Sequence, residues 1–210
     1  MAIFNELSQL IFPSRCFGCA TLANGLCSVC AIDWQMSYFK TALVDFSVHS
    51  SILYSPVASK IIVSAKEGGV GQADEILIAT IIFLLNKIKI SSSEFRLVPI
   101  PSSKKSVRRR GRSFIVDLSQ EISRRTGIST LDCLRIHGTV ADQSGLTRIA
   151  RQENMRGAFH LTKPARGKLI LIDDVITTGA TLKEAARAIH SGGFHAQITA
   201  ITACVAQPLR

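Results

Sequence analysis

Long hydrophobic runs are absent from this sequence of 210 residues. The most apolar stretch, Ile76 to Leu85, stops at Asn86 and Lys87, whereas a helix that spans a membrane needs about 20 such residues. The first twelve residues contain neither a basic region before an apolar stretch nor a small-residue cleavage site, so no signal peptide is expected. These absences predict a cytoplasmic protein with no membrane span, in which the apolar stretch forms a buried helix.

Charged and aromatic residues are also scarce. The charged fraction is 19% and the aromatic fraction is 6%, while hydrophobic residues make up 47% of the chain. A charged fraction below the usual quarter, with this much apolar material, argues against disorder and predicts a real core. No low-complexity tract or internal repeat is visible, so nothing indicates a repeat architecture.

The net charge of +10 is confined to one part of the chain. Residues 1–92 hold six Lys or Arg and six Asp or Glu, so their formal charges cancel. Residues 93–210 hold nineteen basic and nine acidic residues, which accounts for the whole excess. A basic field of this kind indicates an anionic partner, and it fits a polyphosphate or a nucleic acid equally well.

Four of the six cysteines lie within fifteen residues, as Cys16, Cys19, Cys27 and Cys30. Each Cys-x-x-Cys turn directs two thiolates at one point, and two such turns supply the four sulfurs of a tetrahedral zinc site. Disulfides are the alternative, but they are disfavoured in the cytoplasm, and two adjacent redox pairs would be unusual. Because cysteine fills every position, no coordination site stays open, and the expected zinc ion is structural.

The order of the predicted elements indicates an α/β fold with two parts. Residues 1–40 are expected to form an N-terminal helix and a zinc knuckle, and residues 41–210 a larger domain. Strands alternate with helices in the larger domain, which predicts a largely parallel central sheet flanked by helices. The expected strands cover residues 48–54, 95–100, 131–136, 158–161, 168–172 and 196–206. The expected helices cover residues 56–65, 72–90, 106–126, 147–156 and 181–191, with a loop at 66–71.

The segment from Leu169 to Thr181 is the most informative in the sequence. Four apolar residues form a predicted buried strand, with Asp173 and Asp174 at its C-terminal end. The loop that follows consists of Thr177, Thr178, Gly179, Ala180 and Thr181. Ligands of open α/β sheets bind at the carboxyl ends of strands, and the N–H groups of a helix N-terminus attract phosphate. Carboxylates accept hydrogen bonds from hydroxyls, so this pattern suits a ribose 5-phosphate; the alternative is an acidic strand end before an ordinary capped helix.

Together with other segments, this one resembles the competence protein F (ComF) family, a branch of the type I phosphoribosyltransferases with an N-terminal zinc finger. The resemblance covers about residues 14–206. Its elements are the four-cysteine knuckle, Val98-Pro99-Ile100-Pro101, Arg110-Gly111, residues 142–148 (DQSGLTR), residues 154–159 (NMRGAF) and the segment 169–181. The resemblance implies a type I phosphoribosyltransferase fold for residues 41–210.

The chain departs from the ComF pattern in two places. The family usually continues Arg-Gly with Phe-Asn-Gln, whereas here Gly111 is followed by Arg112, Ser113 and Phe114. The family's Lys-Phe-x-Gly element is present as residues 66–69 (KEGG). A role that rests on the Asn-Gln pair is therefore not transferred to this chain.

The resemblance implies a ligand and a set of residues that bind it. The ligand is 5-phosphoribosyl-1-diphosphate (PRPP), or a ribose 5-phosphate of that type, together with Mg²⁺, which prefers hard oxygen ligands. Asp173 and Asp174 are then the catalytic carboxylates that hold the ribose, and the loop 177–181 binds its phosphate. The implied pyrophosphate-binding residues are Pro101, Ser102, Ser103, Lys104 and Arg110. Gln143, Arg148 and Arg151 would belong to a mobile loop that closes over the ligand, or to a structural surface.

Residues 104–112 contain six basic residues in nine, and three interpretations stay open. The side chains could neutralise pyrophosphate, contact a nucleic-acid backbone, or form a solvated helix face. Few aromatic residues for stacking on single strands lie nearby, which weakens the nucleic-acid interpretation.

The leading functional interpretation is therefore a phosphoribosyltransferase-like enzyme, linked by the resemblance to competence and DNA uptake. One alternative is a non-catalytic competence protein that binds single-stranded DNA, with competence or DNA-processing proteins as partners. Another is a regulator that senses PRPP.

Overall fold

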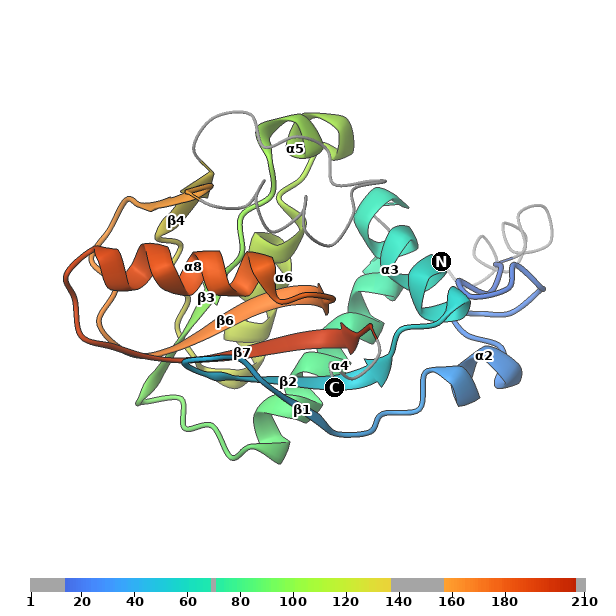
Figure 1. The fold of residues 1–210 in the computed structure, drawn as a ribbon. Helices are drawn as coiled ribbons and strands as arrows, with labels where there is room; N and C mark the ends of the chain where they lie inside the picture. The colour runs from blue at the N-terminus through green and yellow to red at the C-terminus, as the bar shows by residue number, and fades with distance from the viewer. Residues whose placement is uncertain (1–13, 69–70, 137–156, 207–210) are drawn as a thin grey trace.

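The computed structural model describes residues 14–68, 71–136 and 157–206, and it has a five-stranded central sheet between layers of helices (Figure 1). The strands of this sheet are β1 (Phe39–Ala42), β2 (Ser47–Leu53), β3 (Phe95–Pro99), β6 (Gly167–Ile176) and β7 (Ala196–Val205). The helices are α2 (Ser28–Asp33), α3 (Pro56–Gly68), α4 (Gly71–Lys87), α5 (Lys104–Arg110), α6 (Phe114–Thr126) and α8 (Ala180–Ser191). A separate antiparallel pair consists of β4 (Leu134–Ile136) and β5 (Phe159–Leu161).

The strand order of the central sheet is β1-β2-β7-β6-β3. Strands β2, β7, β6 and β3 run parallel, and β1 is antiparallel to β2 at one edge. The predicted α/β class, with a largely parallel sheet flanked by helices, is confirmed. The sequence did not predict β1, whose four residues are too few to show a strand pattern. Strand β6 lies between the parallel strands β7 and β3. Its C-terminal end therefore lies among the carboxyl ends of the strands, where ligands of such folds bind.

The first half of β6 is continuously apolar because helices cover both of its faces. Leu169 and Leu171 face the hydrophobic cluster beneath α8, whereas Ile170 and Ile172 face the cluster beneath α4 and α6. All four side chains are fully buried, and burial of each contributes about 1.5–3 kcal/mol to folding. This packing fixes the position at which the strand delivers the residues that follow it.

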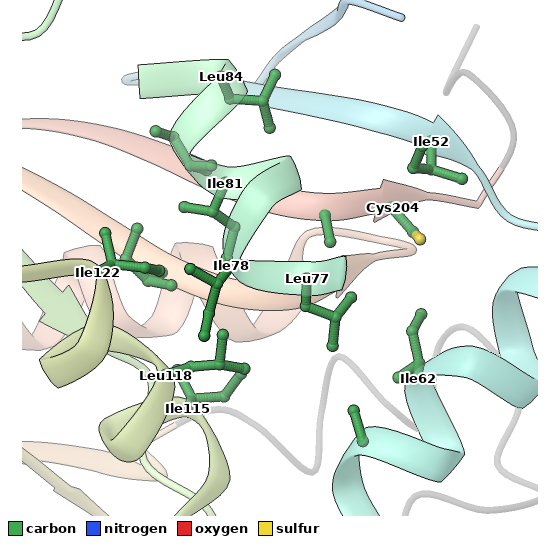
Figure 2. Close-up of a cluster of buried hydrophobic side chains, with 14 of the residues drawn as sticks. Ile52, Ile62, Leu77, Ile78, Ile81, Leu84, Ile115, Leu118, Ile122 and Cys204 are labelled. Atoms are coloured by element: carbon green, nitrogen blue, oxygen red, sulfur yellow. The ribbon is translucent and has the colours of Figure 1, made fainter. Parts of the chain in front are cut away.

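Helix α4 is the buried helix that the apolar stretch predicted. Leu77, Ile81 and Leu84 are at most 1% exposed, and they meet side chains such as Ile122 of α6 in the cluster of Figure 2. Within the described residues, no single helix is long and apolar enough to cross a membrane, although the bent pair α3–α4 meets the length and composition criteria together.

Several helix boundaries differ from the predicted ones. Lys66 and Glu67, predicted in a loop, belong to α3. Helix α4 ends at Lys87, shortly before Lys89 adopts a positive φ of 54°. The prediction of one helix over residues 106–126 is wrong, because Gly111 ends α5 in the left-handed conformation at φ 71°. The helix predicted over residues 147–156 lies outside the described residues.

Arg112, one of the residues that departs from the ComF pattern, fastens α6 to α4. Its Nη1 lies 2.7 Å from Oδ2 of Asp74 on α4, and its Nε lies 3.0 Å from Oδ2 of Asp117 on α6. The side chains of Arg112 and Asp74 are only 19% and 16% exposed. Among the described residues, Oδ1 of Asp74 is buried and has no hydrogen-bond partner, so the guanidinium that binds Oδ2 compensates this carboxylate.

We expect Arg112→Met to lower the free energy of unfolding by about 2 kcal/mol, because it removes the cation from a largely buried carboxylate. Urea denaturation at neutral pH measures this change. Arg108→Met is the matched control, since Arg108 lies in the same basic run with an exposed side chain. Equal stability of the two variants would show that the Arg112 ion pairs contribute nothing.

Candidate functional site

The four cysteines at the N-terminal end come together as the spacing predicted. Their sulfur atoms all lie within 4.8 Å of one another, with Cys16 and Cys30 buried. Backbone N–H groups of Gly18 and Cys27 donate to Sγ of Cys16 at 3.4 and 3.3 Å. Burial raises the pKa of Cys16, but hydrogen bonds from the N–H groups of Cys27, Cys19 and Gly18 outweigh it and lower the pKa to about 6. Four sulfurs at this spacing fit a structural metal ion such as zinc.

The knuckle, defined here as residues 14–34, packs against the larger part of the molecule. A Cβ atom at Gly18 would lie 2.6 Å from Sγ of Cys30 and 2.8 Å from Cγ1 of Val57, so only glycine fits this contact with α3. The indole Nε1 of Trp34 donates to Oγ1 of Thr80 on α4 at 3.1 Å. The knuckle is therefore joined to α3 and α4 by close packing and by a buried hydrogen bond.

The two carboxylates of the central motif lie near the end of β6. Oδ1 of Asp173 accepts a hydrogen bond from the backbone N–H of Asp174 at 2.9 Å. Oδ2 of Asp174 lies 2.6 Å from Nζ of Lys66, which reaches it from α3. Desolvation by burial, followed by the charge of Asp174, raises the pKa of Asp173 well above its usual range, and Lys66 opposes this shift. A carboxyl group with a raised pKa and a charged partner is a common feature of functional sites.

Sequence reasoning missed Lys66 as a member of this site. It assigned Lys66 to a loop, and the contact with Asp174 joins residues that are far apart in the sequence. The one available signal was the match of residues 66–69 to the family's Lys-Phe-x-Gly element. That match marked the lysine but did not indicate its partner.

The loop after β6 turns directly into α8. Gly179 adopts φ 73° as the residue before the helix, and a Cβ there would lie 2.9 Å from Cδ2 of Leu43. The first helical hydrogen bond runs from the N–H of Lys183 to the carbonyl of Gly179. The N–H of Ala180 donates to Oγ1 of Thr178 at 3.3 Å, while the N–H groups of the next helical residues have no partner within the helix, which is the geometry that binds anions. Residues 177–181 thus follow the acidic pair after two residues of β6 and lead into a twelve-residue helix.

The predicted pyrophosphate loop lies beside the acidic pair. Strand β3 pairs with β6 in parallel, and the N–H of Ile100 donates to the carbonyl of Ile172 at 3.0 Å. Residues 101–103 therefore leave the sheet next to Asp173. The hydroxyl of Ser103 accepts from the N–H of Ser106 and caps α5. Gln143, Arg148 and Arg151, predicted in a mobile loop, lie outside the described residues.

The basic run is divided between paired and exposed side chains. Arg109 and Arg110 lie 2.7 and 2.9 Å from Oε1 of Glu67, and Arg112 pairs with two aspartates as described above. Within the described part of the chain, the structure records no ion pair for Lys104, Lys105 or Arg108, which are all exposed. Half of the charge in the run is therefore balanced internally, and the other half faces solvent along α5.

Comparison with known proteins confirms the sequence resemblance. The chain is similar to competence protein F of Haemophilus influenzae, with 35% identity over 104 residues. This match covers 46% of the chain and 44% of that protein, so the chain spans less than half the length of the relative. No family model matches the chain.

Among solved structures, the chain is similar to orotate phosphoribosyltransferase from Aeropyrum pernix. The TM-score is 0.40 at 9% sequence identity, over 82% of this chain and 77% of that one. A likeness at this level carries no argument about the activity or the site of this protein.

Proposed function

We propose that this chain is a phosphoribosyltransferase-like protein that binds PRPP, or a closely related ribose 5-phosphate, at the C-terminal edge of its sheet. One observation carries the proposal: Asp173 and Asp174 lie between the N-terminus of α8 and the loop that follows β3. The similarity to competence protein F supports a role in a process that uses external DNA.

The two ends of a ribose 5-phosphate require different chemistry, and this edge of the sheet offers both. A phosphate dianion suits the N–H groups and the positive dipole end of α8. The acidic pair would repel that phosphate but accepts hydrogen bonds from the neutral ribose hydroxyls. Only five residues, 175–179, separate the acidic pair from the start of α8, so both functions come from one short segment of the chain.

A diphosphate on the anomeric carbon would point from the ribose toward the loop after β3. In that position Pro101, Ser102, Ser103 and the start of α5 are available to bind it. Mg²⁺ would accompany the ligand and supply the positive charge that neutralises its phosphate oxygens. If pyrophosphate departs, the ribose acquires positive charge, and the carboxylates at 173 and 174 are placed to stabilise it.

The knuckle has a structural role in this proposal. Zinc held by Cys16, Cys19, Cys27 and Cys30 would order the knuckle as a small module against the larger domain, which carries the ligand site. Free thiolate ligands persist in a reducing compartment, and this fits a cytoplasmic location.

A second candidate function is binding of single-stranded DNA through α5. The observation that favours it is the exposure of Lys104, Lys105 and Arg108 along one short helix. Phosphate contacts by such side chains are blind to sequence and sensitive to salt. The proposal that the chain acts through a ribose-phosphate site does not require this contact.

Isothermal titration of the purified protein tests the proposal and separates it from the alternative. The ligands are PRPP with Mg²⁺, ribose 5-phosphate with Mg²⁺, and a short single-stranded DNA, each at low and high salt. We expect micromolar binding of PRPP and weaker binding of ribose 5-phosphate. No PRPP binding, with salt-sensitive DNA binding that is lost in a Lys104→Gln, Lys105→Gln, Arg108→Gln variant, would replace the proposal with the second candidate.

A further inference from the structure

The ammonium group of Lys66 is the nearest cation to the acidic pair among the contacts that the structure describes. It lies 2.6 Å from Oδ2 of Asp174, and the two side chains are only 23% and 12% exposed. Ion pairs on an open surface contribute little, whereas a pair with this limited access to water is screened much less. The contact is therefore strong enough to influence what Asp174 can bind.

We infer that Lys66 is a positioning residue of the ligand site, which holds the Asp174 carboxylate in place as a hydrogen-bond acceptor for the ribose diol. This assignment rests on the proposed function, and it adds a residue from α3 to a site otherwise built from the ends of β3 and β6.

The acidic pair needs such a cation because its two members repel each other. Asp173 and Asp174 are adjacent, and Asp173 is desolvated, so the pair is prone to bind a proton. Another titratable group close to them in the described part of the chain is Cys204 on β7, whose thiol has its pKa raised to about 12, chiefly by burial. Cys204 therefore stays neutral and adds no further negative charge. In the described part of the chain, Lys66 is the cation that forms an ion pair with this acidic pair.

The end of α3 is anchored by the residue next to Lys66. The next residue, Glu67, accepts from Nη2 of Arg109 at 2.7 Å and from Nε of Arg110 at 2.9 Å. Helix α5 follows the loop after β3, so α3 joins the two strand-end loops of the proposed site. The flexible lysine side chain is thus presented from a backbone position that ion pairs hold in place, which suits a role in positioning Asp174.

Titration of three variants with PRPP and Mg²⁺ tests this inference. The variants are Lys66→Met, Lys66→Arg and the matched control Lys60→Met. Lys60 lies on the same helix and is exposed. At neutral pH we expect Lys66→Met to weaken PRPP binding about tenfold or more, since hydrogen bonds to a charged acceptor are lost. Lys66→Arg should restore most of the affinity, because it restores the cation, and Lys60→Met should bind like the wild type.

The pH dependence distinguishes positioning from a merely structural role. Lys66 opposes the raised pKa of Asp173. Without Lys66 this carboxyl should therefore keep its proton to higher pH, and the pH below which PRPP affinity falls should rise. Thermal unfolding of each variant accompanies the titrations. If Lys66→Met does not fold, Lys66→Gln takes its place, since the amide can still donate a hydrogen bond to Asp174 without carrying charge.

The possible outcomes separate this inference from the proposed function. Wild-type protein that does not bind PRPP would refute both. Wild-type binding with a Lys66→Met variant that matches Lys60→Met in affinity and in pH profile would refute the role of Lys66 alone. A loss of affinity that rises again with pH, and that Lys66→Arg repairs, would establish it.

Discussion

Cys30→Ser is expected to release the metal from the knuckle and to unfold residues 14–34. Cys30 is 1% exposed, and its sulfur packs against Gly18. A serine there therefore removes the least exposed of the four cysteine ligands. Structural zinc contributes roughly 10–16 kcal/mol to the folding of small zinc domains, and most of this is lost when the site is incomplete. Metal analysis of the purified protein, which should fall from one zinc per chain to almost none, measures the change.

Cys133→Ser is the matched control for this experiment. Cys133 is also fully buried, but it lies in the cluster beneath α8 and not in the knuckle. Its replacement should lower stability slightly and leave the metal content unchanged. If Cys30→Ser and Cys133→Ser retain the same amount of zinc, the four sulfurs do not form a metal site.

Loss of the metal should also change the packing of residues outside the knuckle. Trp34 is 5% exposed and belongs to the same cluster of buried side chains as Leu77 and Ile81 of α4. Unfolding of the knuckle would withdraw this indole and its hydrogen bond to Thr80. We therefore expect the Trp34 fluorescence to shift to longer wavelength when a chelator removes the metal. Cys133→Ser and the wild type should show this shift at the same chelator concentrations.

The elements that the sequence predicted correctly are those whose signals are local. The apolar stretch of α4 and the Leu169–Ile172 run of β6 identify themselves by composition, because helices or strands buried on all sides have almost no polar residues. The knuckle is equally local, since the spacing of four cysteines already defines which sulfurs can meet. Gly179 falls where the turn into α8 needs a positive φ, and the motif places it there.

The features that the sequence did not predict depend on contacts between distant residues. The ion pair of Lys66 with Asp174 and that of Glu67 with Arg110 both bring separate elements together, and no periodicity of either segment encodes them. The break at Gly111 was overlooked because the flanking residues are good helix formers. In the structure, the helix ends at Gly111 and the next residue, Arg112, pairs with Asp74 of α4.

These distant contacts also bear on how the basic run should be interpreted. From sequence alone its six cations are equivalent. In the structure, Arg110 forms an ion pair with Glu67 and its side chain is only 15% exposed. Lys104, in contrast, is exposed at the start of α5. An anionic ligand would compete with Glu67 for Arg110, whereas Lys104 has no recorded ion-pair partner in the described part of the chain. Of the two cations among the predicted pyrophosphate-binding residues, Lys104 is therefore the more available in this conformation.

The double replacement Asp173→Asn with Asp174→Asn is expected to reduce PRPP affinity at least about a hundredfold, because both charged acceptors for the ribose hydroxyls are lost. Isothermal titration at neutral pH measures the change, with Asp132→Asn as the control. Asp132 pairs with Arg135 near β4 and is more exposed, so its replacement should leave PRPP binding intact. Unchanged affinity in the double variant would refute the assignment of this acidic pair to the ligand.

The stability of the single variant Asp173→Asn shows independently whether this carboxyl is strained. The pKa of Asp173 is raised in the folded protein, chiefly by desolvation, so the folded state holds its proton more tightly than the unfolded state does. Below the ordinary carboxyl pKa both states are protonated, and the wild type has no disadvantage. As the pH rises toward the raised pKa, the wild type should lose stability relative to Asp173→Asn. Urea denaturation should therefore find the variant more stable at neutral pH and similar at acid pH; the opposite order would mean that Asp173 is stabilised as a carboxylate and that the site does not store this strain for a ligand.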